Sequence, residues 1–281
     1  MRSRYTCRQP PANAVACSPR DRFACLCPRI GRRHPARTGR SRTAGLRQRD
    51  SVLRYPSKVS IHGLDMQLAT EGFALVPNLL SPAECERVAQ ALVATETSGA
   101  GSRRLLQQAW CAALAHKVMS HPEIRRALPA RARAIQCTFF EKSAAKNWLV
   151  PIHQDLSIPV AGRVDHPALT GWSEKEGAVF VQPPDAVLAQ LLAVRVHVDH
   201  CTMEDGPLRV VPASHELGRM EPDRAAHLGR TQGVAVPANR GDAMLMRPLI
   251  LHASSKSSGA SLRRVLHFLF GPDTLPYGLA W

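Results

Sequence analysis

The stretch WLVPIHQDLSIPV, residues 148–160, reads as a β-strand that carries two ionisable side chains. Successive side chains of a strand point to opposite faces, so His153 and Asp155 share one face. The other face is almost wholly apolar and contains Val150, Ile152, Gln154, Leu156, Ile158 and Val160. The apolar face must pack on something, and the His/Asp face must then meet solvent or a polar pocket.

Three later segments show the same alternation. In LAVRVHVDH, residues 192–200, three valines alternate with Arg195, His197 and Asp199. In SLRRVLHFLF, residues 261–270, Arg263 and His267 lie opposite a packed face that Arg264 interrupts and that contains Leu262, Leu266, Phe268 and Phe270. The segment DAMLMRPLILHASS, residues 242–255, reads as a fourth strand with His252 and Ser254 on one face.

These polar faces do not have the composition of a solvent-exposed sheet. Such a face would carry Lys, Glu, Thr and Ser, whereas these carry His, Asp and Arg, which bind metals and anions. A barrel or jelly roll with a polar pocket inside and helices outside fits better.

The helices come first in the chain. Ser81, Pro82 and Glu84 form the pattern of an N-cap, a first-turn proline and a capping box. The helix that follows has a predicted buried stripe made of Cys85, Val88, Ala89, Leu92 and Val93. A second helix is expected over residues 105–119. We therefore expect a mainly β domain with flanking α-helices over residues 66–281.

The basic charge lies outside that domain. Residues 1–65 hold 15 basic and 3 acidic residues, whereas residues 66–281 hold 22 and 19. The nearly balanced domain predicts no nucleic-acid partner. We expect residues 1–65 to be a disordered tail, an organelle transit peptide, or an untranslated stretch with Met66 as the true start.

Cysteine usage and hydropathy bear on location. No apolar run approaches the 18 residues of a membrane helix, so we expect no membrane partner. The eight cysteines show neither a zinc-site spacing nor a preceding secretory signal. We expect reduced thiols in a cytoplasmic protein.

A metal site follows from His153 and Asp155 together with one distant histidine. Two ligands two residues apart in a strand can hold one ion, and His252 lies 99 residues later near the end of its predicted strand. Two histidines and one carboxylate form the facial triad of non-haem Fe(II) oxygenases, which leaves open positions on the metal. Arg263, on the pocket face of the next strand, can hold a carboxylate by a bidentate pair.

The segments NWLVPIHQDLSIPV, DGPLRVVPASH and RPLILHASSKSSGASLRRVLHFLF resemble the phytanoyl-CoA dioxygenase family. The resemblance runs from about Gly72 to Trp281. It implies a double-stranded β-helix, which is a jelly-roll, cupin-like core. It also implies an enzyme that uses Fe(II), 2-oxoglutarate and O2.

The same resemblance implies roles for particular residues. His153, Asp155 and His252 would bind the iron. Arg263 would hold the far carboxylate of 2-oxoglutarate, although a strand bulge would give that role to Arg264. Ser254 matches a position that often hydrogen-bonds the co-substrate.

The other candidate residues have less specific signals. Lys142 shares a predicted face with Gln136 and Thr138, which would place it near the co-substrate or leave it as a surface lysine. Trp148 would line the site or belong to the core. Arg195 and His197 would contact substrate or co-substrate, or pair with Asp199. We expect three further histidines to be structural: His200, His215 and His267.

The resemblance therefore leads us to expect hydroxylation of a C–H bond of a small-molecule substrate, with release of succinate and CO2. Because the histidine ligands must be neutral, activity should fall in acid. One alternative is a cupin-like, metal-dependent hydrolase or isomerase, which would have no use for Arg263. Another is a non-catalytic relative that binds a ligand.

Overall fold

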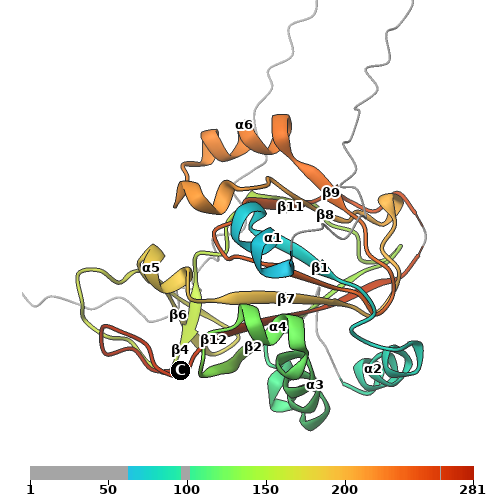
Figure 1. Cartoon of the computed structure of the whole chain (residues 1–281), viewed down its shortest axis with the longest axis horizontal. Coiled ribbons are helices and arrows are strands. Elements are labelled where there is room, and N and C mark those ends of the chain that lie inside the picture. Colours follow the sequence, from blue (N-terminus) through green and yellow to red (C-terminus); the bar gives the residue numbers. More distant parts are fainter. Residues whose placement is uncertain (1–62, 96–101, 260) are drawn as a thin grey trace, which may run out of the picture. The chain divides into compact units, whose positions relative to one another are not determined.

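The computed structural model describes residues 63–95, 102–259 and 261–281. The predictions for the basic tail therefore lie almost entirely outside the described residues. Within them, the strands form three antiparallel sheets, and helices flank the two larger ones (Figure 1).

The first sheet has five strands and carries most of the core. In spatial order these are β1 (Phe73–Val76), β10 (Ala243–Met246), β7 (Leu192–His197), β12 (Arg263–Pro272) and β2 (Ala132–Lys142). All four neighbouring pairs are antiparallel. Strand β12 is paired with β7 on one side and with β2 on the other, so the direction of each of its side chains is tightly constrained.

A second sheet of four strands faces the first. Its order is β3 (Val150–His153), β11 (His252–Ser254), β8 (Leu208–Val210) and β9 (Val234–Val236). Leu208 and Val210 of this sheet share a buried cluster with Phe73 and Met244 of the first sheet. A smaller third sheet contains β4 (Ile158–Val160), β6 (Ala178–Gln182) and β5 (Thr170–Lys175). The predicted mainly β, jelly-roll fold with flanking helices is confirmed.

The helices cover the outer faces of the two larger sheets. The main core cluster joins residues of the early helices to the outward side chains of β7 and β12, namely Val194, Val196, Leu266, Phe268 and Phe270. Those helical elements are α1 (Leu64–Glu71), α2 (Pro82–Ala94), the 3-10 turn η1 (Leu105–Gln107), α3 (Ala109–Ser120) and α4 (Pro122–Ala127). Figure 1 shows α3 and α4 on one side of β7 and β12.

The later helical elements are α5 (Asp185–Leu188), η2 (Met203–Asp205), η3 (Ser214–Leu217) and α6 (Pro222–Gln232). Helix α6 lies over the second sheet in Figure 1, and its Ala225 and Leu228 pack with Ile152 and Leu251. No helix in the described part of the chain is long and apolar enough to cross a membrane.

The helix predictions are largely confirmed. The Ser81 hydroxyl accepts from the Glu84 backbone, and the Glu84 carboxylate accepts from the Ser81 backbone, which completes the capping box. Val93 is wrong as a member of the buried stripe, because it is 82% exposed at the end of α2. The expected helix over residues 105–119 begins as a 3-10 turn, and α3 itself starts at Ala109.

Two of the predicted strands are each divided in the structure. Residues 150–160 form β3 and β4, which belong to different sheets, and residues 154–157 lie outside both. Residues 242–255 likewise form β10 and β11, one in each large sheet. Leu262 is 41% exposed and lies outside the packed face of β12. A jelly roll passes the chain between its sheets at such breaks, which a run of apolar letters does not reveal.

Phe268 provides a test of the packing that holds β12. Its ring is fully buried and stacks on Phe270 at a centroid distance of 5.9 Å. We expect Phe268→Ala to lower the free energy of unfolding by about 3–5 kcal/mol, because the lost ring leaves a cavity. Urea unfolding measures this change. Val93→Ala is the matched exposed control, with an expected change of about 0.5 kcal/mol or less; a loss of similar size in both variants would contradict the assigned packing.

Candidate metal centre

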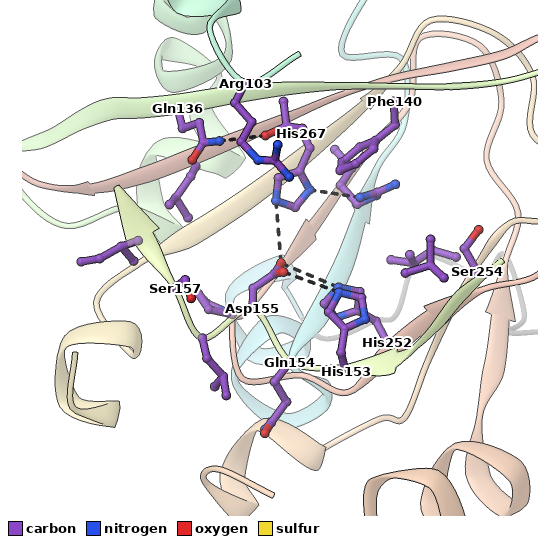
Figure 2. Close-up of a pocket in the computed structure, with 18 of the residues that line it drawn as sticks. Arg103, Gln136, Phe140, His153, Gln154, Asp155, Ser157, His252, Ser254 and His267 are labelled. Atoms are coloured by element: carbon purple, nitrogen blue, oxygen red, sulfur yellow. Dashed lines mark hydrogen bonds and ion pairs between the residues drawn. The ribbon is translucent and has the colours of Figure 1, made fainter. Parts of the chain in front are cut away.

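Three potential ligands meet where the two larger sheets face each other. His153 ends β3 and His252 begins β11, and the two residues are register partners across that pair of strands. Asp155 follows β3, and its backbone N–H donates to the Pro248 carbonyl at 2.9 Å. One ligand atom from each of the three residues lies within 4.8 Å of the others (Figure 2).

Gln154 fixes the short segment between the two ligands. Its side-chain amide donates to the carbonyls of Leu249, at 2.6 Å, and Gly218, at 2.8 Å. Its side-chain oxygen accepts from the Met220 backbone at 2.9 Å. The expectation that Asp155 continues the strand is wrong: long-range hydrogen bonds place it, rather than the alternation of one strand.

Hydrogen bonds also set the tautomers of the two histidines. The His153 Nδ1 atom lies 2.8 Å from the Pro151 carbonyl, and the His252 Nδ1 atom lies 2.9 Å from the Ile250 carbonyl. A carbonyl can only accept, so each neutral ring carries its hydrogen on Nδ1 and keeps a lone pair on Nε2. Both Nε2 atoms face the Asp155 carboxylate, at 3.8 Å and 3.7 Å. This pattern of donors is the one in which histidine binds a metal.

The local electrostatics keep His252 and Asp155 in metal-binding form. Burial lowers the pKa of His252 to about 4, against the opposing effect of Asp155, so this ring stays neutral through mild acid. Desolvation raises the pKa of Asp155, but the surrounding histidines, His252 foremost, lower it by more. The carboxylate is therefore ionised beside a neutral imidazole. Protonation of His252, and the loss of metal binding that it causes, should therefore begin at a lower pH than for an ordinary histidine.

The triad lines a cavity of about 390 Å³. Most of the predicted site residues line it as well: Gln136, Thr138, Trp148, Arg195, Ser254 and Arg263. His197 is buried and does not line the cavity. Lys142 is fully buried, so it is not a surface lysine, and its Nζ atom reaches the Ser254 hydroxyl at 2.6 Å.

Two buried cations lie near this cavity: Arg263 lines it, and Lys142 reaches it only through Ser254. Arg263 and Lys142 are register partners on β12 and β2. The Arg263 side chain is 3% exposed, donates to the Gly206 carbonyl, and forms no ion pair with a described carboxylate. Burial, with the Arg263 charge adding to it, lowers the pKa of Lys142 to about 8. Together with the Ser254 hydroxyl, these groups offer donors for a carboxylate.

Arg264 occupies a different environment from its neighbour. Its guanidinium forms a two-point pair with Asp199, with both N–O distances at 2.8 Å. Asp199 therefore pairs with Arg264, and the alternative in which it pairs with Arg195 or His197 is wrong. Of the two adjacent arginines, Arg263 is the one that lines the cavity.

Several cavity residues went unrecognised in the sequence. His267 was expected to be structural, yet it lines the cavity, and its Nε2 atom lies 3.9 Å from Asp155. Its position four residues after Arg263, on the same face of one strand, was the available signal. Arg103 and Lys175 also line the cavity, as do apolar residues from four sheet or loop segments: Phe140, Leu156, Phe180 and Leu208. Nothing local in the sequence marks these as neighbours.

The comparisons with known proteins agree with this architecture. The family model for phytanoyl-CoA dioxygenase (PhyH) matches residues 68–265. The chain therefore belongs to that family. No curated protein matches the sequence.

Solved structures share the fold at low sequence identity. The non-heme alpha-ketoglutarate-dependent epimerase SnoN from nogalamycin biosynthesis is 20% identical with a TM-score of 0.54, covering 75% of this chain and 82% of its own. Iron-bound HygX from Streptomyces hygroscopicus is 18% identical with a TM-score of 0.55, covering 74% and 85%. EctD from S. alaskensis, in its apoform, is 16% identical with a TM-score of 0.56, covering 83% and 90%.

Metal binding by the triad is directly testable. We expect the metal-free protein to bind one Co(II) ion, and we expect Asp155→Ala to weaken that binding by at least about 100-fold, because a charged ligand is lost. Calorimetric titration gives the affinity. His215→Ala, which removes a histidine hydrogen-bonded to the distant Ala69 carbonyl, should bind as the wild type does. Equal affinities for Asp155→Ala and the wild type would contradict the site.

Proposed function

We propose that this member of the phytanoyl-CoA dioxygenase family hydroxylates a C–H bond of a small molecule, using Fe(II), 2-oxoglutarate and O2. The observation that carries the proposal is the pairing of two elements in one cavity. The first is a triad whose two imidazoles present their Nε2 lone pairs beside a carboxylate. The second is the pair Arg263 and Ser254, which line the cavity, with the Lys142 ammonium hydrogen-bonded to Ser254.

The residues present fit both groups. Two histidines and one carboxylate bind iron on one side and leave positions for a co-substrate and dioxygen. Arg263 fits the far carboxylate of 2-oxoglutarate because a guanidinium holds a carboxylate with two parallel hydrogen bonds. Its Nε atom has no hydrogen-bond partner among the described residues, so it has donor capacity to spare.

When bound, iron and 2-oxoglutarate supply the oxidising chemistry, which converts 2-oxoglutarate and O2 to succinate and CO2 and inserts one oxygen atom into the substrate. The chain's own residues bind, orient and exclude water. Phe140, Phe180 and Leu208 make the wall apolar, while Trp148 stands near the Lys142 ammonium, 5.8 Å from its ring centroid. A cavity of about 390 Å³ suits a small molecule beside the co-substrate.

The competing hypothesis is a cupin-like hydrolase or isomerase that uses the same three residues to bind its metal. Such an enzyme has no need for a buried guanidinium without an acidic partner. Burying Arg263 without an ion pair costs stability, so its place beside the triad favours an anionic co-substrate.

The first experiment measures succinate formed from 2-oxoglutarate. We expect formation to require both Fe(II) and O2. Arg263→Gln should raise KM for 2-oxoglutarate about 10- to 150-fold, the equivalent of about 1.5–3 kcal/mol for a charged hydrogen bond.

Arg264→Gln is the matched control for this substitution. It breaks the Asp199 pair outside the cavity, so it should lower the midpoint of urea unfolding and leave KM unchanged. The assignment fails if Arg264→Gln raises KM as strongly as Arg263→Gln. Succinate formation that persists without Fe(II) would exclude the proposed reaction.

The pH dependence tests the part played by Lys142. Its pKa of about 8 means that the ammonium carries its charge below that pH and loses it above. We expect kcat/KM for 2-oxoglutarate to fall as the pH rises through about 8, because kcat/KM reports the free enzyme. Lys142→Met should show a lower kcat/KM below pH 8 and no such decline; an identical decline in the variant would assign the titration to another group.

A further inference from the structure

A third histidine of the cavity faces Asp155 and is not one of the three potential ligands. His267 lies on β12, and its Nε2 atom is 3.9 Å from Asp155 Oδ2. This separation is close to those of His153 and His252, at 3.8 Å and 3.7 Å. Figure 2 shows the carboxylate between His267 on one side and the other two rings on the opposite side.

Arg195 determines which nitrogen of His267 carries the hydrogen. The two residues are register partners on β7 and β12, and Arg195 Nη1 lies 3.1 Å from His267 Nδ1. A guanidinium can only donate, so His267 Nδ1 must accept. An imidazole whose Nδ1 accepts a hydrogen bond keeps a lone pair there and is therefore neutral. A neutral ring that accepts at Nδ1 carries its hydrogen on Nε2.

His267 therefore has the opposite tautomer to the other two rings. His153 and His252 turn lone pairs toward the carboxylate, whereas His267 turns an N–H group toward it. An Nε2 atom that carries hydrogen cannot bind a metal, so His267 is not a fourth ligand. It can donate to the carboxylate instead.

The His267 ring is held in place from two sides. Besides the Arg195 bond, it forms a T-shaped contact with the Phe140 ring at a centroid distance of 6.1 Å. The Arg195 guanidinium in turn lies over the same Phe140 ring, at 5.5 Å. The donor is thus oriented before any metal binds.

We propose that His267 is a positioning residue for the metal centre, donating its Nε2–H to one oxygen of Asp155 and leaving the other for the metal. The inference rests on the proposed metal site and deepens it. The present 3.9 Å is longer than a hydrogen bond, so the proposal requires a small rotation of the carboxylate toward His267 when the metal binds. With one oxygen held, Asp155 occupies a single metal position and leaves the others open for 2-oxoglutarate and dioxygen.

Two substitutions at His267 separate positioning from packing. His267→Leu removes the donor, and His267→Gln keeps an amide N–H at similar reach. We expect His267→Leu to weaken Fe(II) binding about 10- to 100-fold, the usual effect of losing a partner that orients a metal ligand. His267→Gln should recover most of the affinity. Anaerobic competition with a chelating dye measures both, without turnover.

A spectroscopic readout reports the ligand geometry itself. The visible charge-transfer band of the anaerobic Fe(II)–2-oxoglutarate complex depends on how the carboxylate binds. We expect the band to shift in His267→Leu and to return toward the wild-type position in His267→Gln. His215→Leu, a histidine substitution away from the cavity, should change neither the affinity nor the band.

Arg195→Met tests how the tautomer is set. Without the guanidinium donor, His267 is free to move its hydrogen to Nδ1, and we expect Fe(II) binding to weaken. The double variant Arg195→Met/His267→Leu should be no weaker than His267→Leu alone, because both act through one hydrogen bond. Additive losses would mean that Arg195 acts separately.

The inference is overturned if His267→Leu binds Fe(II) with wild-type affinity and an unshifted band, or if the Gln and Leu variants behave alike. Should the variants not fold, side-chain 15N NMR of the wild-type, Zn(II)-loaded protein still decides, because Nδ1–H on His267 would contradict the tautomer. The two proposals also fail separately. The wild-type protein could bind Fe(II) in a way that depends on His267 and yet form no succinate. That result would contradict the proposed reaction and would still support this inference.

Discussion

The site depends on the alternation of side chains along β12. Outward residues of this strand, Leu266 and Phe268 among them, pack beneath the early helices. Inward residues, Arg263 and His267, face the cavity. A shift of one residue would exchange these two sets, burying charge in the core and exposing aromatic rings. Pairing with β7 on one side and β2 on the other opposes that shift, so the packing of the core also aims the polar groups of the site.

The cavity concentrates positive charge around a single carboxylate. Arg195, Arg263 and Lys142 are all buried, whereas Asp155 is the one acidic residue among those that line the cavity in the described part of the chain. Burial, and then the nearby Arg263 charge, lower the pKa of Arg195 to about 10. Hydrogen bonds to backbone carbonyls and a hydroxyl satisfy only some of the donors of these cations: the Nε atoms of Arg195 and Arg263 have no partner among the described residues. Buried charge without matching acids costs folding free energy, and strongly perturbed groups of this kind cluster at functional sites.

Much of this arrangement could be predicted from the sequence because it rests on local rules. Alternation separated Arg263 from Arg264, and the capping box at Ser81 predicted the start of α2. The error at residues 154–157 has its physical origin in long-range contacts. The Pro248 carbonyl and the side chain of Gln154 bend residues 154–157 out of the strand. No period in the sequence records those bonds.

The role of His267 also could not be predicted from local sequence patterns. The sequence put it on the same strand face as Arg263, but a lone histidine on a strand is most often structural. Its significance comes from two partners distant in the chain, Arg195 and Asp155, which together decide its tautomer. A chemical role of this kind becomes visible only when the donors and acceptors around a ring can be counted.

Anomalous X-ray diffraction at the iron edge tests the central claim most directly, using crystals grown with Fe(II) and 2-oxoglutarate under anaerobic conditions. The account predicts one iron peak, bound by Nε2 of His153, Nε2 of His252 and one oxygen of Asp155. It also predicts the far carboxylate of 2-oxoglutarate against Arg263. An iron peak elsewhere, His267 among the ligands, or the co-substrate's far carboxylate away from Arg263 would contradict it.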